Sequence, residues 1–144
     1  MASKGKPSSE NELTPLGGGA LVKSSDQGQL DFEIDFFSGI IERHPNHLDV
    51  LRVHGNNLTL RGRYLEGLQI DKRLVSLRPS DALAHYNLAC SFSLLRKKEQ
   101  ALKTLRQAIE LGYRDFRYIR EDRDLENIRT DPRFRQLLRE FEDA

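Results

Sequence analysis

An internal period of 34 residues constrains the fold of this 144-residue chain more than any other feature. A shift by one period places Gly55 on Ala89, and it places Gly67 on Ala101. Apolar residues recur every three or four positions from Leu30 onward, and no useful length alternates with the period of two that a β-strand needs. Two helices fill each period. The sequence therefore predicts an all-α stack of antiparallel helix pairs.

Small residues mark the places where paired helices would cross. Gly55 and Ala89 lie on the first helix of each pair, and Gly67 and Ala101 lie twelve residues later on the second. Helices approach closely where no large side chain separates them, so larger side chains here would overpack the crossing. The predicted packing residues are Gly55, Gly67, Leu74, Pro79, Ala89, Ala101 and Ala108.

Composition changes along the chain divide it into five segments. The first 29 residues hold five of the ten glycines and few large aliphatic side chains, which is typical of a flexible tail. A short docking peptide around Leu13 to Leu21, or an engineered leader, is the alternative interpretation of that tail. The predicted segments are the tail over 1–29, a degenerate repeat with only its second helix over 30–45, complete repeats over 48–81 and 82–115, and a helical cap over 116–144.

Local signals support these boundaries. Asp81 stands where a helix N-cap belongs, and Gly112 is placed to end a helix in a left-handed conformation. Asp131 followed by Pro132 predicts another helix start. The apolar stripe that follows would cover the last repeat, and it consists of Phe134, Leu137, Leu138 and Phe141.

Composition also excludes several classes of protein. The 23 basic and 22 acidic side chains give a net charge of +1, which removes the usual electrostatic argument for nucleic-acid or membrane binding. No apolar run approaches the roughly 20 residues that a membrane span needs. The segment 1–10 is polar throughout, so we expect no signal peptide and a cytoplasmic location.

Candidate catalytic and metal-binding residues do not converge in the sequence. His44, His47 and His54 lack acidic or cysteine partners at ligand spacing, so turn and cap roles are expected and no metal is predicted. Cys90 is the only cysteine and cannot form an internal disulfide. Both Cys90 and His85 are interpreted as packed residues. No phosphate loop, nucleophile elbow or zinc-protease motif occurs, so neither an enzyme nor a cofactor is predicted.

With its two helix pairs aligned by the 34-residue period, the chain resembles the tetratricopeptide repeat (TPR) family. The matching positions are Leu51, His54, Gly55, Leu58, Gly67 and Pro79 in the first repeat, and His85, Leu88, Ala89, Phe92, Ala101 and Ala108 in the second. His54, Asp71 and Tyr113 depart from the family pattern. The resemblance implies a right-handed superhelix, an α-solenoid, acting as a non-catalytic adaptor or scaffold for protein binding. The C-terminal run resembles the segment that closes some bacterial TPR arrays, which suggests a bacterial protein.

The family resemblance also implies a partner-binding groove, lined by the first helix of each pair. The matched positions are Asp49, Arg52, Asn56, Thr59, Leu83, Tyr86, Asn87, Cys90, Ser93 and Arg117. Arg52 and Asn56 resemble the first half of a carboxylate clamp for a peptide terminus. Glu121 stands where a second cation is needed, so the clamp is incomplete. The alternative is that Arg52 and Asn56 are ordinary exposed polar residues.

Two other functions stay open at this point. The helix Leu30 to Arg43 lacks a first-helix partner, so Phe36 and Phe37 would be exposed and could form a homodimer. Arg114, Arg117 and Arg120 lie at helical spacing and could bind RNA. The longer span 114–143 holds eight arginines and nine acidic residues, which indicates an ion-paired surface instead. The identity of a protein or peptide partner is not encoded in any motif.

Overall fold

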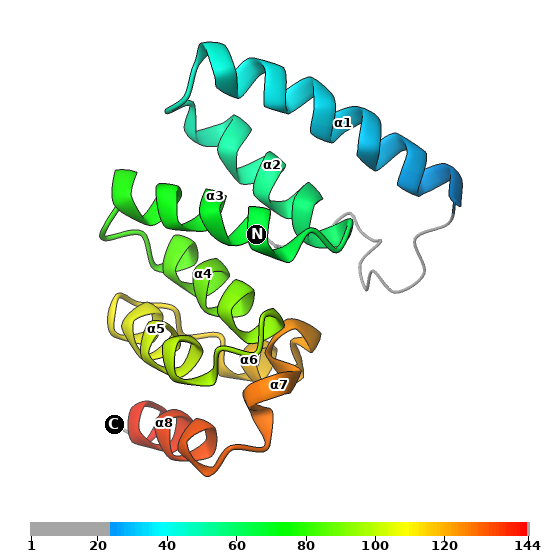
Figure 1. Cartoon of the computed structure of the whole chain (residues 1–144). Helices are drawn as coiled ribbons and strands as arrows, with labels where there is room; N and C mark the ends of the chain where they lie inside the picture. The colour runs from blue at the N-terminus through cyan, green and yellow to red at the C-terminus, as the bar shows by residue number, and fades with distance from the viewer. Residues whose placement is uncertain (1–23, 144) are drawn as a thin grey trace. The chain divides into compact units, whose positions relative to one another are not determined.

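The computed structural model describes residues 24–143, and within that range the chain is helical, with no β-strand (Figure 1). The chain divides into two compact units, residues 1–77 and 78–144, which we describe separately as unit 1 and unit 2. None of the helices that the structure describes has the length and apolar character to cross a lipid bilayer.

The described residues of unit 1, 24–77, form three helices. These are α1 (Ser24–Arg43), α2 (Leu48–Leu60) and α3 (Tyr64–Leu77). Helix α2 packs against both α1 and α3. The buried apolar side chains that hold the three helices together are Ile34, Leu51, Leu58, Leu68 and Leu74.

Helix α1 begins at Ser24, before the expected start at Leu30, so the predicted boundary of the tail at residue 29 is wrong. Local contacts extend the helix beyond its apolar stripe. Asp26 lies in the first turn, where a carboxylate interacts favourably with the helix dipole. The Gln29 side chain donates a hydrogen bond to Glu33 one turn later, at 3.0 Å. The rest of the predicted tail, including Leu13 to Leu21, lies outside the described residues.

Unit 2 combines a second helix pair with a C-terminal segment. The pair is α4 (Ala82–Leu94) and α5 (Lys98–Glu110), which begin one 34-residue period after α2 and α3. Asp81 caps α4 by accepting hydrogen bonds from the Leu83 and Ala84 amides, which confirms that prediction. The C-terminal segment comprises α6 (Phe116–Glu121), the 3₁₀ helix η1 (Arg123–Leu125), α7 (Glu126–Arg129) and α8 (Pro132–Glu142).

The C-terminal segment shares one apolar core with α4 and α5. Helix α8 begins at Pro132, and the Asp131 carboxylate accepts a hydrogen bond from the Arg133 amide at 2.9 Å, so the predicted helix start is confirmed. Phe134, Leu137 and Leu138 are buried in this core. An ion pair of 2.8 Å between Arg106 and Glu140 joins α5 to α8. The cap therefore gives α5 an apolar neighbour on its outer side.

The small residues lie at the helix crossings, with one exception. A Cβ atom added at Gly55 would lie 3.2 Å from Cγ2 of Ile70, and one added at Gly67 would lie 3.2 Å from Oγ1 of Thr59. In unit 2, Ala89, Ala101 and Ala108 are fully buried. Pro79 is exposed in the turn before α4, so it does not contribute a packed side chain. Its role is to stop α3, because proline restricts the residue before it to extended conformations.

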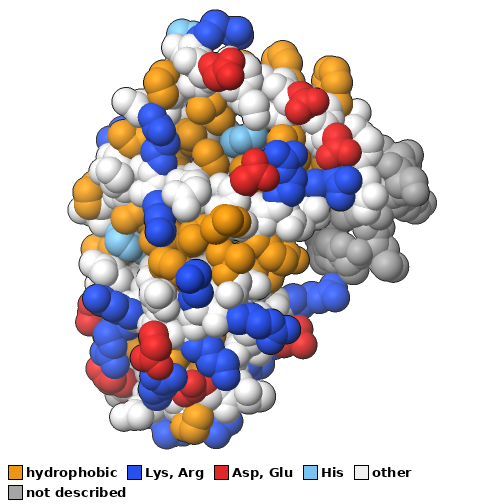
Figure 2. All heavy atoms as spheres, in the orientation of Figure 1, with side chains coloured by type: hydrophobic (Ala, Val, Ile, Leu, Met, Phe, Trp, Pro, Cys, Tyr) orange, Lys and Arg blue, Asp and Glu red, His pale blue; other side chains and the backbone are white. Residues whose placement is uncertain are grey.

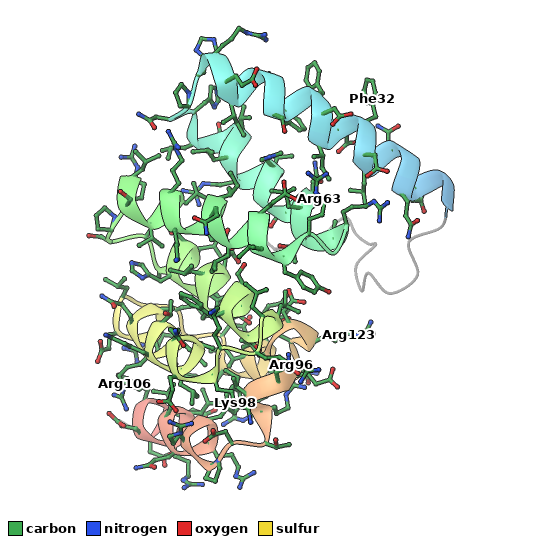
Figure 3. All side chains as sticks on the ribbon, viewed as in Figure 1. Phe32, Arg63, Arg96, Lys98, Arg106 and Arg123 are labelled. Atoms are coloured by element: carbon green, nitrogen blue, oxygen red, sulfur yellow. The ribbon has the colours of Figure 1, made fainter. Side chains whose placement is uncertain are left out.

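The turn inside each helix pair requires a left-handed residue. Gly62 between α2 and α3 has φ 86°, and Gly112 after α5 has φ 120°, as predicted for a left-handed stop. Arg96 occupies the position one period after Gly62, and its φ is 61° (labelled in Figure 3). A side chain at such a backbone angle carries strain, so the second hairpin is closed less favourably than the first.

Candidate functional site

Part of the predicted groove lies on the surface of α2 in unit 1. Asp49 is exposed, and Arg52 and Asn56 are partly exposed. The three residues follow one another at intervals of three and four positions, so they lie along one stripe of the helix. Thr59 continues this stripe but lies close to the α3 backbone at Gly67. The stripe carries a carboxylate, a guanidinium and an amide.

The opposite face of α2 contains a buried histidine, His54, which is 6% exposed. Burial lowers the pKa of His54 below its usual 6.5, the positive charge of Arg63 lowers it further, and Glu66 opposes this. Arg63 and Glu66 form a bidentate ion pair with bonds of 2.6 and 2.8 Å at the start of α3 (Arg63 is labelled in Figure 3). Hydrogen bonding from Arg63 lowers the pKa of Glu66. Nδ1 of His54 has no hydrogen-bond partner among the described residues. His54 is therefore held neutral inside unit 1.

The unit 2 half of the predicted groove is largely buried, which corrects the sequence-based assignment. Tyr86 and Ser93 are fully buried and Cys90 is 2% exposed, so these side chains do not contact a ligand in this conformation. The 3₁₀ helix η1 and helix α7 pack against α4. This coverage could not be read from the repeat pattern, because residues 116–129 do not follow the repeat.

The remaining predicted groove residues of unit 2 are scattered. Leu83 and Asn87 are partly buried on α4, whereas Arg117 lies on α6 with its side chain 89% exposed. Arg117 contacts Glu121 on its own helix at 3.5 Å. Leu83, Asn87 and Arg117 therefore do not form the second half of a carboxylate clamp, which needs a cation beside the amide.

Asp122 organises the buried centre of unit 2, and the sequence analysis did not identify it. The Tyr86 hydroxyl donates a 2.5 Å hydrogen bond to Asp122 Oδ2, and the Asp124 amide donates to Asp122 Oδ1 at 3.0 Å. The Tyr86 ring stacks on Tyr113 with centroids 4.1 Å apart. Arg129 donates a hydrogen bond to the Asp122 carbonyl. Burial raises the pKa of Tyr86 far above its ordinary value, with Cys90 and Asp122 adding to the effect, so the hydroxyl stays a donor.

Potential metal ligands also meet at this centre. Ligand atoms of Cys90, Asp122 and Asp124 lie within 4.8 Å of one another. The Cys90 thiol is 3.8 Å from Asp122 Oδ2, the oxygen that already accepts the Tyr86 hydroxyl. Both oxygens of Asp122 thus have protein donors. This arrangement fits a hydrogen-bonded structural centre that fastens η1 to α4, and hydrogen bonding accounts for its geometry.

The other three histidines, His44, His47 and His85, have local roles. His47 caps α2 by accepting a hydrogen bond from the Val50 amide at 3.4 Å. His85 Nε2 donates to the Pro79 carbonyl at 2.8 Å. His44 is exposed in the turn after α1. The positions of His44 and His47 agree with the turn and cap roles expected from the sequence, and His85, expected to be packed, is 6% exposed. The same role was expected for His54 and is wrong, because His54 is buried on α2.

The three arginines considered for RNA binding are engaged within unit 2. Arg114 donates to the Ile109 carbonyl and lies over the Phe141 ring, and Arg120 forms an ion pair with Glu142. Arg117 has the exposed contact to Glu121 described above. The three side chains therefore do not form an uncompensated basic stripe, and RNA binding at this stripe is not supported.

A pair of aromatic rings is exposed on α1. Phe32 is 65% exposed and Phe36 is 56% exposed, and their rings stack with centroids 6.5 Å apart. Phe32 points away from α1 on the side opposite α2 (Figure 3). Phe37, expected to be exposed, is partly buried and meets the edge of Phe36 at 5.3 Å. The exposed pair is therefore Phe32 and Phe36, not Phe36 and Phe37.

Comparison with known proteins finds a related sequence and similar solved structures. No family model matches the chain. The related sequence is a protein of Arabidopsis thaliana whose name describes it as chloroplastic, and the chain is 33% identical to it over 93 residues. The match covers 62% of this chain and 28% of that protein, so the chain spans less than a third of this relative's length. Because the relative is named as chloroplastic, the cytoplasmic location expected here stays a prediction, as does the bacterial origin.

Two of the similar structures are of MamA. One is MamA from residue 41 to its end, from Desulfovibrio magneticus RS-1, and the other is the ArsTM double mutant of MamA RS-1. Each aligns with a TM-score of 0.58 at 19% identity, covering 83% of this chain and 72% of the MamA chain. Likeness at this identity establishes the fold alone. The chain has an all-α, TPR-like solenoid fold.

Proposed function

We propose that this protein is a non-catalytic interaction module that binds a peptide segment of a partner protein along α2. The TPR-like fold and the MamA likeness support a protein-interaction or scaffold role. The observation that carries the proposal is the stripe Asp49, Arg52 and Asn56, which α1 and α3 leave accessible while they bury the opposite face of α2.

The chemistry of the stripe favours a peptide that carries a carboxylate. A guanidinium and an amide one helical turn apart can donate several hydrogen bonds to a carboxylate, and charge-assisted bonds are the stronger kind. Asp49 adds a negative charge near the start of α2, which disfavours a second acidic group at that end. A peptide with one carboxylate near Arg52 and a basic or neutral residue toward Asp49 therefore fits the stripe.

A peptide-library screen tests this proposal. We expect wild-type protein to select a set of peptides, and Arg52→Ala to bind them about tenfold or more weakly because a charge-assisted hydrogen bond is lost. Arg43→Ala, at the exposed end of α1, is the matched control and should bind like wild type. Circular dichroism checks that both variants are folded.

The outcomes separate two kinds of failure. Selection of no peptide by wild-type protein would contradict the proposed function. Equal binding by wild type and Arg52→Ala would place the binding surface away from the α2 stripe. Asn56→Ala provides a second variant on the stripe in case Arg52 also supports the fold.

Self-association through α1 is a second candidate, favoured by the exposed rings of Phe32 and Phe36. Large apolar side chains on one helix face are typical of a surface that another molecule covers. A second copy of the chain would present the same rings, so the two pairs could pack against each other.

Size-exclusion chromatography with light scattering tests this second candidate. A dimer that Phe36→Glu converts to a monomer would support self-association. Leu65→Glu, at an equally exposed apolar residue on α3, is the control and should stay dimeric. A monomeric wild-type protein at high concentration would overturn this candidate.

A further inference from the structure

The C-terminal segment of unit 2 contains a pocket of about 340 Å³ that the sequence analysis did not anticipate. Helices α6, α7 and α8 contribute its walls. The lining residues are Arg120, Arg129, Phe134, Arg135, Leu138 and Arg139. On the face shown in Figure 2, Lys and Arg side chains over the C-terminal helices stand among Asp and Glu side chains. Four of the six lining residues are therefore arginines, brought together from three helices.

Helix periodicity explains how α8 shapes the pocket. Arg135 and Arg139 are one turn apart on α8 and are exposed. Phe134 and Leu138 precede them by one residue each and are 2% and 1% exposed. The apolar pair thus forms a buried floor beside the two cations.

The four arginines differ in how far their charge is compensated. Arg120 forms an ion pair with Glu142. Arg129 donates to the Asp122 carbonyl, which is a neutral acceptor, and its Nε is buried without a partner among the described residues. No carboxylate of residues 24–143 lies within ion-pair distance of Arg135 or Arg139. Three guanidinium charges at this pocket thus have no counter-charge in the part of the chain that the structure describes.

Such an arrangement matches a ligand with more than one negative charge. A phosphomonoester carries about −1.5 to −2 charges at neutral pH and three strong acceptor oxygens. Guanidinium groups bind such oxygens in a planar, bidentate manner. A single carboxylate would compensate only one of the three charges. We propose that this pocket binds a phosphomonoester group.

The size of the pocket limits what is attached to the phosphate. Small-molecule pockets range from roughly 300 to 1,000 Å³, so this one is at the small end and holds a phosphate with a short attached group. A phosphorylated side chain and a small phosphorylated metabolite share this chemistry. The site uses none of the α2 residues, so it goes beyond the proposed function and stands or fails independently of it.

Isothermal titration calorimetry with the full chain tests the proposal. The first probe is a blocked Ala-phosphoserine-Ala tripeptide, with the same peptide carrying Ser or Glu as matched ligands. Glycerol 3-phosphate is the second probe and represents a small metabolite. We expect the phosphopeptide to bind at least about tenfold more tightly than the Glu peptide, because a dianion meets more of the guanidinium charge. Tighter binding of the phosphopeptide than of glycerol 3-phosphate would identify a phosphorylated side chain as the ligand, and the reverse order would identify a small metabolite.

Paired variants place the binding in the pocket. Arg135→Gln combined with Arg139→Gln should weaken phosphate binding about tenfold or more without unfolding the protein, because both side chains are exposed. Arg117→Gln removes an exposed cation of α6 that does not line the pocket, and it should bind like wild type.

Three results would overturn the proposal. The first is that neither phosphate probe binds at low ionic strength. The second is that the Arg135→Gln, Arg139→Gln double variant binds phosphate as tightly as wild type does. The third is that single-stranded oligouridine binds more tightly than both phosphomonoesters, since this result would identify a phosphodiester surface for nucleic acid instead.

Discussion

The helix pair α2–α3 of unit 1 and the pair α4–α5 of unit 2 start from the same 34-residue pattern and have different surroundings (Figure 1). In unit 2, η1 and α7 pack on α4, and α8 packs on α5. In unit 1, α1 packs on α2 and presents Phe32 and Phe36 to the outside. The repeat thus encodes the hairpin, whereas the flanking segments decide which of its surfaces stay available for binding.

The largest expected effect concerns the buried centre of unit 2, which has no counterpart among the described residues of unit 1. Asp122→Ala removes the acceptor of the Tyr86 hydroxyl and the cap of η1, and should lower the free energy of unfolding by about 3 kcal/mol. Urea denaturation measures this change. Hydrogen exchange should accelerate in α4 and α5 more than in α2 and α3. Glu121→Ala, at the exposed neighbouring residue, is the control. An unchanged urea midpoint for Asp122→Ala would contradict the assigned role.

The second prediction concerns the helix crossing of unit 2. Ala101 is fully buried, so Ala101→Leu should cost about 1–3 kcal/mol of stability through overpacking. Lys103→Leu, two residues away on the exposed face of α5, introduces the same side chain and should change stability by less than about 0.5 kcal/mol. Thermal melts followed by circular dichroism compare the two. Equal melting temperatures would mean that the crossing at Ala101 is wrong.

The third prediction concerns unit 1, where His54 occupies a position that is usually leucine in the TPR family, which the chain resembles. The unfolded chain binds a proton at His54 more readily than the folded chain, because burial depresses the pKa of His54 below 6.5 in the fold. Above pH 6.5 the protonation equilibrium of His54 therefore costs no folding free energy, and below that value the free energy of unfolding decreases as the pH falls. His54→Leu removes this pH dependence.

The same substitution should also raise stability at neutral pH. Nδ1 of His54 is buried without a partner among the described residues, so its replacement by leucine should stabilise unit 1 by about 1 kcal/mol. Urea denaturation at about pH 7.5 and about pH 5.5, on either side of the usual histidine pKa, measures both effects. His44→Leu at an exposed site is the control. A wild-type pH profile retained by His54→Leu would contradict the role of His54.

The smallest expected effect concerns the two hairpin turns. Arg96→Gly should raise stability by about 0.5 kcal/mol, because glycine adopts a positive φ without strain but loses more entropy on folding. Gly62→Arg at the matching turn of unit 1 should have the opposite sign. Chemical denaturation of the pair of variants tests the comparison, and the same sign for both would show that the two turns are not equivalent.

Much of the fold could be predicted from local residue patterns. Asp81, Gly112 and Asp131 act on backbone groups within a few residues, so their capping roles follow from the sequence alone. The start of α1 could not be placed correctly, because its first turns rest on polar contacts such as Gln29 to Glu33, which leave no apolar stripe. Pro79 does not pack as expected, because its effect is on the backbone.

The candidate sites were harder to predict. Tyr86, Cys90 and Ser93 occupy groove positions by register, but the C-terminal segment packs on α4 and these side chains are buried. Phe32 was overlooked beside Phe36, because a list of apolar residues does not show which face a neighbouring helix covers. The arginine pocket was missed because its cations come from α6, α7 and α8, whereas sequence spacing grouped Arg114, Arg117 and Arg120 on one stretch.

The sequence by itself determined the helix pairs, their period and their caps, since these depend on interactions between residues at most one or two turns apart. Tertiary structure alone decided that Asp122 is a buried acceptor and that three helices surround one cationic pocket. It also decided which groove positions stay accessible. The physical reason is that burial and charge compensation depend on segments far apart in the chain, and the spacing of residues along the chain carries no record of those distances.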